Sequence, residues 1–223
     1  MYLLYLGNKN YSSWSLRPWV LMRHFDIAFE ERPVQVGGRG AHGGHAAYSD
    51  SGLVPCLHDG DLRVWDSLAI AEYLAERHAG LWPADRRARA RARSICAEMH
   101  SGFGAMRAAL PMNVKLRLRG GPVSDEVGAD IERVVRIWSG CRADAVGAGP
   151  YLFGDFSIAD AMYAPVVWRF HTYNIALPPA AAHYRDAMLA HPAMREWQQA
   201  ALAETVALGH YDTVAERFGG PRD

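Results

Sequence analysis

Three serines, Ser12, Ser13 and Ser15, lie between an apolar segment at 2–6 and a segment at 16–25 that has the apolar spacing of a helix. The apolar segment is typical of a buried strand. A turn from a strand into a helix leaves backbone N–H groups unpaired at the first helical turn, and the helix dipole favours negative charge there. The serines therefore lie where an anion can bind. Serine is also a common N-cap residue, so the turn alone leaves a simple cap as the alternative.

The elements around this turn alternate between strand and helix. After the first helix, the pattern predicts a second, edge strand at 28–36 and an apolar third strand at 53–57. An Asp-Gly turn at 59–60 predicts a hairpin to a fourth strand at 62–65. A helix is then expected over 66–78.

Pro55 interrupts the third predicted strand, directly after Val54. A proline usually confines a strand to the edge of a sheet, because it has no N–H to donate. The alternative is a cis peptide bond that leaves the backbone of Val54 facing a ligand. We favour the cis peptide because the segment is so apolar.

The rest of the chain is predicted to be helical. One long helix is expected over 85–110, and it ends before a proline. Further helices are expected over 125–146, 180–189 and 193–207, and the residues after Thr213 are expected to fray.

A capping box is predicted ahead of one more apolar helix. Ser157 and Asp160 are three residues apart, with Asp in the position usually held by Glu. The role of this pair is expected to be structural.

Composition excludes several classes of protein. The chain has 223 residues, of which 50% are hydrophobic and 22% charged, as in a globular protein large enough for two small domains. Its formal net charge of zero argues against a nucleic-acid-binding protein. Without an apolar run of about 18 residues or a basic-then-apolar leader, we expect neither a membrane span nor a signal peptide. Cys56, Cys96 and Cys141 form no C-x-x-C pair, which favours reduced thiols in the cytoplasm.

Two further patterns have ordinary explanations. The arginines of 86–93 spread around most of a helix, so they predict solvated surface, in part a dimer rim, rather than a nucleic-acid site. His42 and His45 have no third ligand nearby in the sequence, so no metal site is predicted.

Taken in order, these elements resemble the cytosolic glutathione transferases. That family has a Ser, Tyr or Cys just before the first helix, a Val-Pro with cis proline in mid-domain, and an acidic residue plus Ser opening the last helix of that domain. Here those positions are Ser12, Val54, Pro55, Asp66 and Ser67. The family's Asn-Pro-x-Gly-x-Val-Pro run reads Ser-Asp-Ser-Gly-Leu-Val-Pro at 49–55, so its first two positions differ.

The resemblance implies an α/β thioredoxin-like N-terminal domain plus an all-α C-terminal helical domain. The expected boundaries are 1–80 for the glutathione-binding domain, 81–88 for a linker and 89–223 for the helical domain with the second-substrate pocket. The implied cosubstrate is glutathione, and the implied assembly is a cytoplasmic homodimer.

Ser12 is the first candidate for activating the glutathione thiol. A cysteine-like thiol with a pKa of about 8.5 is only about 3% thiolate at pH 7, and lowering that pKa by about two units makes it mostly thiolate. A serine hydroxyl that donates to sulfur at a helix N-terminus is a source of this shift. Ser12 lies five residues before Arg17, which is the family spacing, and Ser13 and Ser15 rank second and third. Because serine forms no mixed disulfide, we expect conjugation or isomerisation rather than disulfide reduction.

The other groups of glutathione also have expected partners. The backbone of Val54, before cis Pro55, pairs with the cysteinyl amide. Asp66 and Ser67 meet the glutamyl ammonium and carboxylate, although a simple N-cap is the alternative for this pair. The glycyl carboxylate is expected to bind one cation of the 37–45 loop. The three candidates are Arg39, His42 and His45.

Within the family, the turn is nearest the zeta class, whose signature is Ser-Ser-Cys-Ser-x-Arg. The run at 12–17 reads Ser-Ser-Trp-Ser-Leu-Arg, so Trp14 replaces the cysteine. This class implies a glutathione-dependent isomerase of an acidic substrate, for which Arg107 or Arg169 is the expected partner. Five apolar residues are expected to line the second-substrate pocket or to belong to the core: Met106, Met112, Trp168, Phe170 and Tyr173.

Two hypotheses of function follow. The first is a glutathione transferase that conjugates or isomerises a small hydrophobic or acidic electrophile. The second is a non-catalytic protein of the same fold that holds ligands or acts as a partner subunit.

Overall fold

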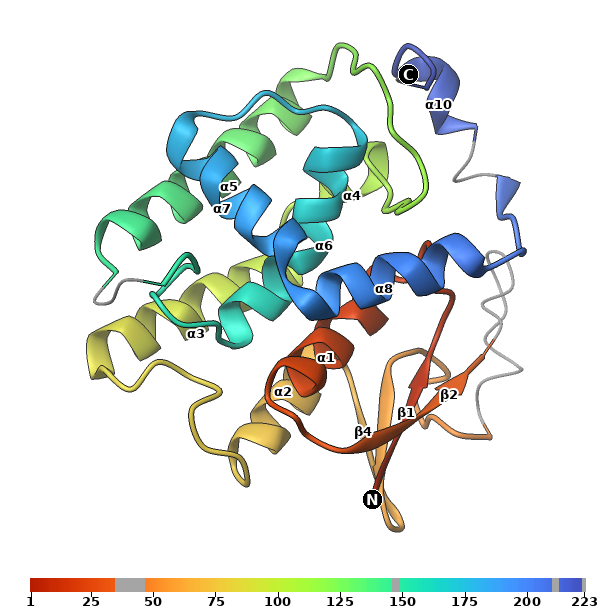
Figure 1. The fold of residues 1–223 in the computed structure, drawn as a ribbon, viewed down its shortest axis with the longest axis vertical. Helices are drawn as coiled ribbons and strands as arrows, with labels where there is room; N and C mark the ends of the chain where they lie inside the picture. Colours follow the sequence, from red (N-terminus) through yellow and green to blue (C-terminus); the bar gives the residue numbers. More distant parts are fainter. Residues whose placement is uncertain (35–46, 146–148, 210–212, 222–223) are drawn as a thin grey trace.

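Figure 1 shows the computed structural model of the chain, which describes residues 1–34, 47–145, 149–209 and 213–221. An α/β half comes first, and a helical half follows and packs against it. Both halves of the predicted fold class are therefore confirmed: a thioredoxin-like α/β arrangement, then an all-helical arrangement. The exact domain boundaries stay a prediction.

A four-stranded sheet forms the α/β half, in the order β2-β1-β3-β4. Its strands are β1 (Tyr2–Leu6), β2 (Phe29–Pro33), β3 (Cys56–Asp59) and β4 (Leu62–Trp65). β2 is parallel to β1, whereas β3 is antiparallel to both β1 and β4. The alternation of side chains along β1 buries Leu4 and Leu6 in the core. Two helices complete this half, α1 (Ser13–His24) and α2 (Ser67–Ala75).

The third strand begins after Pro55, not before it. The prediction of a strand at 53–57 is wrong at its start, because Pro55 has no N–H to donate to the sheet and the ladder begins at Cys56. The Val54–Pro55 peptide bond is cis, as expected.

Seven named helices of the described chain form the second half. They are α3 (Arg86–Ser101), α4 (Gly104–Ala109), α5 (Asp125–Ala143), α6 (Ile158–Thr172), α7 (Pro179–Ala190), α8 (Pro192–Ala203) and α10 (Val214–Arg217). None of the helices within the described residues combines the length and apolar character needed to cross a membrane.

The predicted single helix over 85–110 is wrong, because two helices occupy it. Gly102 is extended after α3, and Phe103 has a φ of +60° before α4. A Cβ on Gly102 would lie 2.9 Å from the backbone oxygen of Glu98, so the close approach of the chain requires glycine here.

The expectation that the chain frays after Thr213 is also wrong. α10 forms there, and Phe218 is 2% exposed. Its ring packs edge-on against Tyr173, with the ring centroids 4.8 Å apart.

α6 is the central helix of the second half and is buried along nearly its whole length. The predicted capping box is present at its start: Asp160 Oδ2 accepts from the backbone N–H of Ser157 at 2.9 Å. Burial raises the pKa of Asp160 to about 6, although hydrogen bonds from Leu152 and Ser157 oppose the shift. α6 packs against α1, so the helix that carries the serine turn is covered by both halves.

The arginines at the start of α3 contact several neighbours rather than forming one stripe. Arg89 donates to the backbone oxygen of Pro83 at 2.9 Å, and Arg93 pairs with Glu72 at 3.3 Å. The three cysteines are buried and free, in agreement with the prediction of reduced thiols.

Candidate active site

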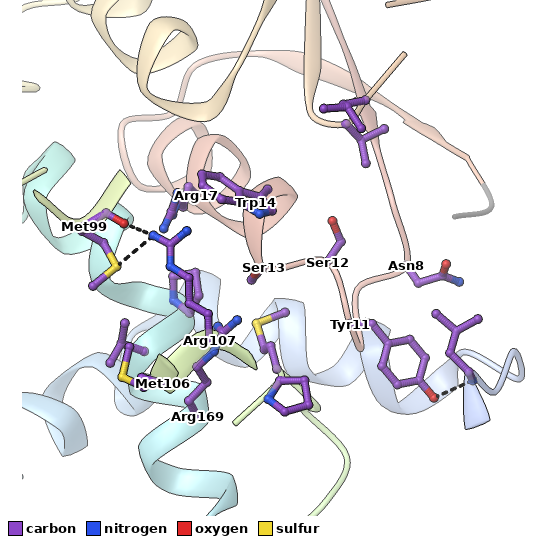
Figure 2. A pocket seen from close by; sticks show the side chains of 17 residues that line it. Asn8, Tyr11, Ser12, Ser13, Trp14, Arg17, Met99, Met106, Arg107 and Arg169 are labelled. Atoms are coloured by element: carbon purple, nitrogen blue, oxygen red, sulfur yellow. Dashed lines mark hydrogen bonds between the residues drawn. The ribbon is translucent and has the colours of Figure 1, made fainter. Parts of the chain in front are cut away.

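A cavity of about 350 Å³ lies between the first turn of α1 and the helical half. Figure 2 shows the side chains that line it, with Ser12, Ser13 and Trp14 on one side and Arg107 and Arg169 on another. The structure thus brings Ser12, Ser13 and both predicted arginines to one cavity.

Ser12 and Ser13 both line this cavity, whereas Ser15 does not. Ser15 is fully buried, and its Oγ accepts hydrogen bonds from the backbone N–H of Gly7 at 3.0 Å and from Ser12 Oγ at 2.8 Å. Ser15 therefore ties the end of β1 to the start of α1. This arrangement favours a structural role for the third candidate.

Ser12 is the N-cap residue of α1, but its side chain makes no capping hydrogen bond. Its backbone oxygen accepts from the N–H of Leu16 at 3.2 Å, which starts the helix. The first amides of α1 are consequently not covered by the Ser12 hydroxyl. A helix start of this kind attracts a negative charge.

Leu53 and Val54 belong to the segment before β3 and also line the cavity. The cis bond after Val54 belongs to this part of the wall, while Pro55 itself is buried and is not among the lining residues.

Asp66 and Ser67 lie at the start of α2 and do not line the cavity. Asp66 Oδ1 accepts from the backbone N–H of Leu68 at 2.8 Å, and Oδ2 lies 2.6 Å from His100 Nε2. Burial opposes ionisation of Asp66, but the hydrogen bonds from His100 and the α2 amides outweigh it and lower the pKa. The N-cap interpretation of Asp66 therefore holds, and binding of the glutamyl group by this pair stays a prediction.

Arg17 is a cavity residue that the sequence singled out only for its spacing from Ser12. It is 4% exposed, its Nη1 donates to Ser67 Oγ at 3.2 Å, and its Nε has no hydrogen-bond partner within the described chain. Burial lowers its pKa to about 9, and repulsion from Arg107 and Arg169 adds to the shift.

Trp14 contacts two of these guanidinium groups. The Cζ atoms of Arg17 and Arg107 lie 4.2 Å and 4.9 Å from the centroid of its ring. Such cation–π contacts stabilise a cation that has lost water. The sequence signal for this arrangement was the spacing of three between Trp14 and Arg17, which puts both on one helix face.

Arg107 and Arg169 belong to α4 and α6. The Nη2 group of Arg107 donates to the backbone oxygens of Met99 and, at 3.3 Å, His100. Arg169 is 7% exposed. The described lining of the cavity includes three arginines and no Asp or Glu, so the cavity favours an anion.

Only some of the predicted apolar residues face the cavity. All five are buried in the core, and Met106 and Met112 also line the cavity, whereas Trp168, Phe170 and Tyr173 do not. Sequence reasoning missed the neighbouring Pro111 and Val166, which no chemical signal distinguished from core.

Arg39, His42 and His45 lie outside the described residues, so the structure does not address them. In the part of the chain that is described, no group of three His, Cys, Asp or Glu side chains is arranged to hold a metal ion.

Comparison with known proteins connects this geometry to one family. A family model described as "Glutathione S-transferase, N-terminal domain" matches residues 11–77, and one described as "Glutathione S-transferase, C-terminal domain" matches residues 69–200.

Solved structures give the same result for the fold. The chain is 24% identical to a glutathione transferase homolog from Burkholderia with bound glutathione, over 91% of this chain and 99% of that chain, with a TM-score of 0.68. It is 22% identical to a theta class glutathione S-transferase from Xanthomonas axonopodis pv. citri with glutathione bound, over 92% and 99%, with a TM-score of 0.64. A glutathione transferase from Populus trichocarpa is 18% identical, over 92% and 100%, with a TM-score of 0.69.

Proposed function

Since this chain belongs to the glutathione S-transferase family, we propose that it binds glutathione in the cavity and transfers the glutathione sulfur to a small electrophile. The observation that carries the proposal is the position of Ser12 and Ser13, which open into one cavity at the start of α1. Two of the solved structures with this fold, those from Burkholderia and Xanthomonas axonopodis, contain bound glutathione, which supports the choice of cosubstrate.

The proposed chemistry starts with deprotonation of the glutathione thiol. Ser12 turns its hydroxyl from Ser15 toward the sulfur and donates a hydrogen bond to the anion. A hydrogen bond to a charged group is worth about 1.5–3 kcal/mol, which corresponds to about one to two pKa units at 1.36 kcal/mol per unit. The helix start and the nearby guanidinium groups favour the same anion.

The thiolate then attacks an electrophilic carbon of the second substrate, and a carbon–sulfur bond forms. In conjugation a leaving group departs with the bonding electrons, or a proton is taken up at the neighbouring carbon. In isomerisation the carbon–sulfur bond breaks again after the substrate has changed geometry. In either case the sulfur is not oxidised, consistent with a serine rather than a cysteine at position 12.

Among electrophiles, we favour those that carry a carboxylate. Arg107 and Arg169 lie on the helical side of the cavity and would pair with such a group, which is the substrate chemistry of the zeta-like isomerase suggested by the sequence. Apolar electrophiles are the alternative, because Met106 and Met112 share the same wall. A homodimer and a cytoplasmic location stay predictions from the family resemblance.

The test measures glutathione binding and turnover separately. Wild-type protein is expected to be retained on immobilised glutathione, to show the ultraviolet absorbance of bound thiolate near neutral pH, and to conjugate chlorodinitrobenzene. Ser12→Ala is expected to raise the pKa of the bound thiol by about one to two units. Ser13→Ala is the matched control at the adjacent cavity position.

A larger shift in Ser13→Ala than in Ser12→Ala would exchange the roles of the two serines. Retention on glutathione without any thiolate absorbance or turnover would instead favour the non-catalytic hypothesis, a binding protein on the same fold.

A further inference from the structure

The segment that carries Ser12 is held in place mainly by residues of the helical half. Glu204, the C-cap residue of α8, accepts two hydrogen bonds from consecutive amides of this segment. Its Oε1 lies 2.6 Å from the backbone nitrogen of Lys9, and its Oε2 lies 3.0 Å from that of Asn10. One carboxylate therefore fixes two successive peptide groups just ahead of the serine turn.

Asn10 is 1% exposed and is bound on its other sides by the segment before α5. Its backbone oxygen accepts from the N–H of Val114 at 3.2 Å, and its side-chain oxygen accepts from the N–H of Lys115 at 2.9 Å. The Lys115 ammonium in turn donates to the backbone oxygen of Glu204. The two anchors of the turn are thus joined to each other.

Lys9 is held in the same way by α8. Its backbone oxygen accepts from Trp197 Nε1 at 2.8 Å, and its ammonium lies 5.4 Å from the centroid of that ring. The same ammonium pairs with Glu31 Oε2 at 2.7 Å, which connects the segment to β2.

The restraint passes to Ser12 through the backbone. The oxygen of Asn8 accepts from the amides of Tyr11 at 3.1 Å and Ser12 at 2.8 Å, so residues 8–12 form one hydrogen-bonded turn. A displacement of Lys9 and Asn10 therefore moves the Ser12 hydroxyl relative to the cavity.

We propose that Glu204 is a positioning residue for the Ser12 hydroxyl, acting across the contact between the two halves. This inference rests on the proposed function, in which Ser12 stabilises the thiolate. Glu204 is not among the residues that line the cavity. A misplacement of about 1 Å is enough to lower a rate by about a hundredfold, so a positioning carboxylate has a measurable effect without contacting sulfur.

The experiment compares Glu204→Ala and Glu204→Gln with Glu196→Ala. Glu196 is a suitable control because it is an exposed carboxylate on the same helix and also reaches α1, pairing with Arg23 at 3.3 Å. Three quantities are measured for each: the pKa of bound glutathione from thiolate absorbance, kcat/KM with chlorodinitrobenzene, and the melting temperature.

We expect Glu204→Ala to raise the pKa of the bound thiol by about one unit and to lower kcat/KM about tenfold at neutral pH. Glu204→Gln keeps one acceptor oxygen and is expected to show a smaller change of the same sign, which also covers the case in which the alanine variant does not fold. Glu196→Ala is expected to leave the thiol pKa unchanged.

The outcomes separate this inference from the proposed function. If wild-type protein shows no bound thiolate, the proposed function is wrong. If wild-type protein forms thiolate and the folded Glu204 variants keep the same thiol pKa while melting at a lower temperature, Glu204 is only structural and the inference is overturned.

Discussion

His191 gives the fold a dependence on pH that can be worked out from its contacts. Its Nδ1 accepts from the backbone N–H of Ala193 at 3.1 Å and caps α8, and its Nε2 lies 2.8 Å from Nδ1 of His24. Since Nδ1 accepts from an amide, the ring proton is on Nε2 and is donated to His24. Both rings are therefore neutral in the folded protein, at the contact between α1 and α8.

Burial lowers the pKa of His191 from 6.5 to about 4, and repulsion from His24 adds to this shift. Below pH 6.5 the unfolded chain binds a proton that the folded chain does not bind, so folding stability falls as the pH drops from 6.5 toward 4 and then levels off. A pH of 5 is 1.5 units below the pKa of His191 in the unfolded chain. At 1.36 kcal/mol per unit, the unfolding free energy is therefore about 2 kcal/mol lower than at neutral pH.

The perturbation is His191→Asn, since asparagine is a good N-cap residue and does not titrate. Urea unfolding is measured at pH 7.5 and pH 5 for wild type, for His191→Asn and for the exposed control His183→Asn. We expect wild type to lose about 1–2 kcal/mol more than His191→Asn between the two pH values. The comparison between variants is needed because Asp160 has a pKa raised to about 6 in the folded protein. Its protonation increases folding stability as the pH falls, whereas His191 decreases it.

If wild type and His191→Asn lost equal unfolding free energy between pH 7.5 and pH 5, the reasoning would be refuted, because protonation of His191 would then not be coupled to folding. If His183→Asn also lost less unfolding free energy than wild type between the two pH values, the effect would not be specific to the contact between α1 and α8.

Two other predictions concern the helical half. Ser157→Ala removes the cap of α6 and is expected to cost about 0.5–2 kcal/mol of unfolding free energy with little change in kcat, measured by urea unfolding beside an activity assay. Arg169→Met is expected to raise the KM for chloronitrobenzoate about tenfold or more, because a buried carboxylate loses its partner, while the KM for the neutral carboxamide of the same compound stays within about twofold. Equal changes for both compounds, or a change in Arg87→Met, an exposed arginine of α3, would contradict the assignment of Arg169 to an anionic electrophile.

Features set by a few neighbouring residues were predictable from the sequence. The cis bond before Pro55 and the cap formed by Ser157 and Asp160 depend on local chemistry, and both are present. The position of the serine turn was also predictable from local pattern. An apolar strand, then polar residues, then helical spacing indicates a turn from a strand into a helix.

Features set by tertiary contacts were not predictable in this way. Nothing local distinguishes Ser15 from Ser12. The full burial of Ser15 and its hydrogen bond from Gly7, just after β1, indicate a structural role. The break at Gly102 depends on how closely the chain approaches Glu98, and the ordered tail depends on the packing of Phe218 in the folded protein.

The division of apolar residues at the cavity has the same cause. Met106 and Trp168 are both large and buried in the core, yet Met106 lines the cavity and Trp168 does not, although neighbouring residues of α6 do. Hydrophobicity predicts burial, but it does not say which buried residue faces a ligand.

α1 packs against both halves of the molecule, and this limits which chimeras and truncated forms of the protein can fold. It contacts α2 on one side and α6 and α8 on others, and its Trp19 meets Trp197 edge-on with the ring centroids 5.1 Å apart. A chimera that joins this sheet to helices without a tryptophan at the position of Trp197 would leave Trp19 without its ring partner. The two halves must therefore be exchanged together with the surface of α1, and a truncation before α3 would expose that apolar surface and favour aggregation.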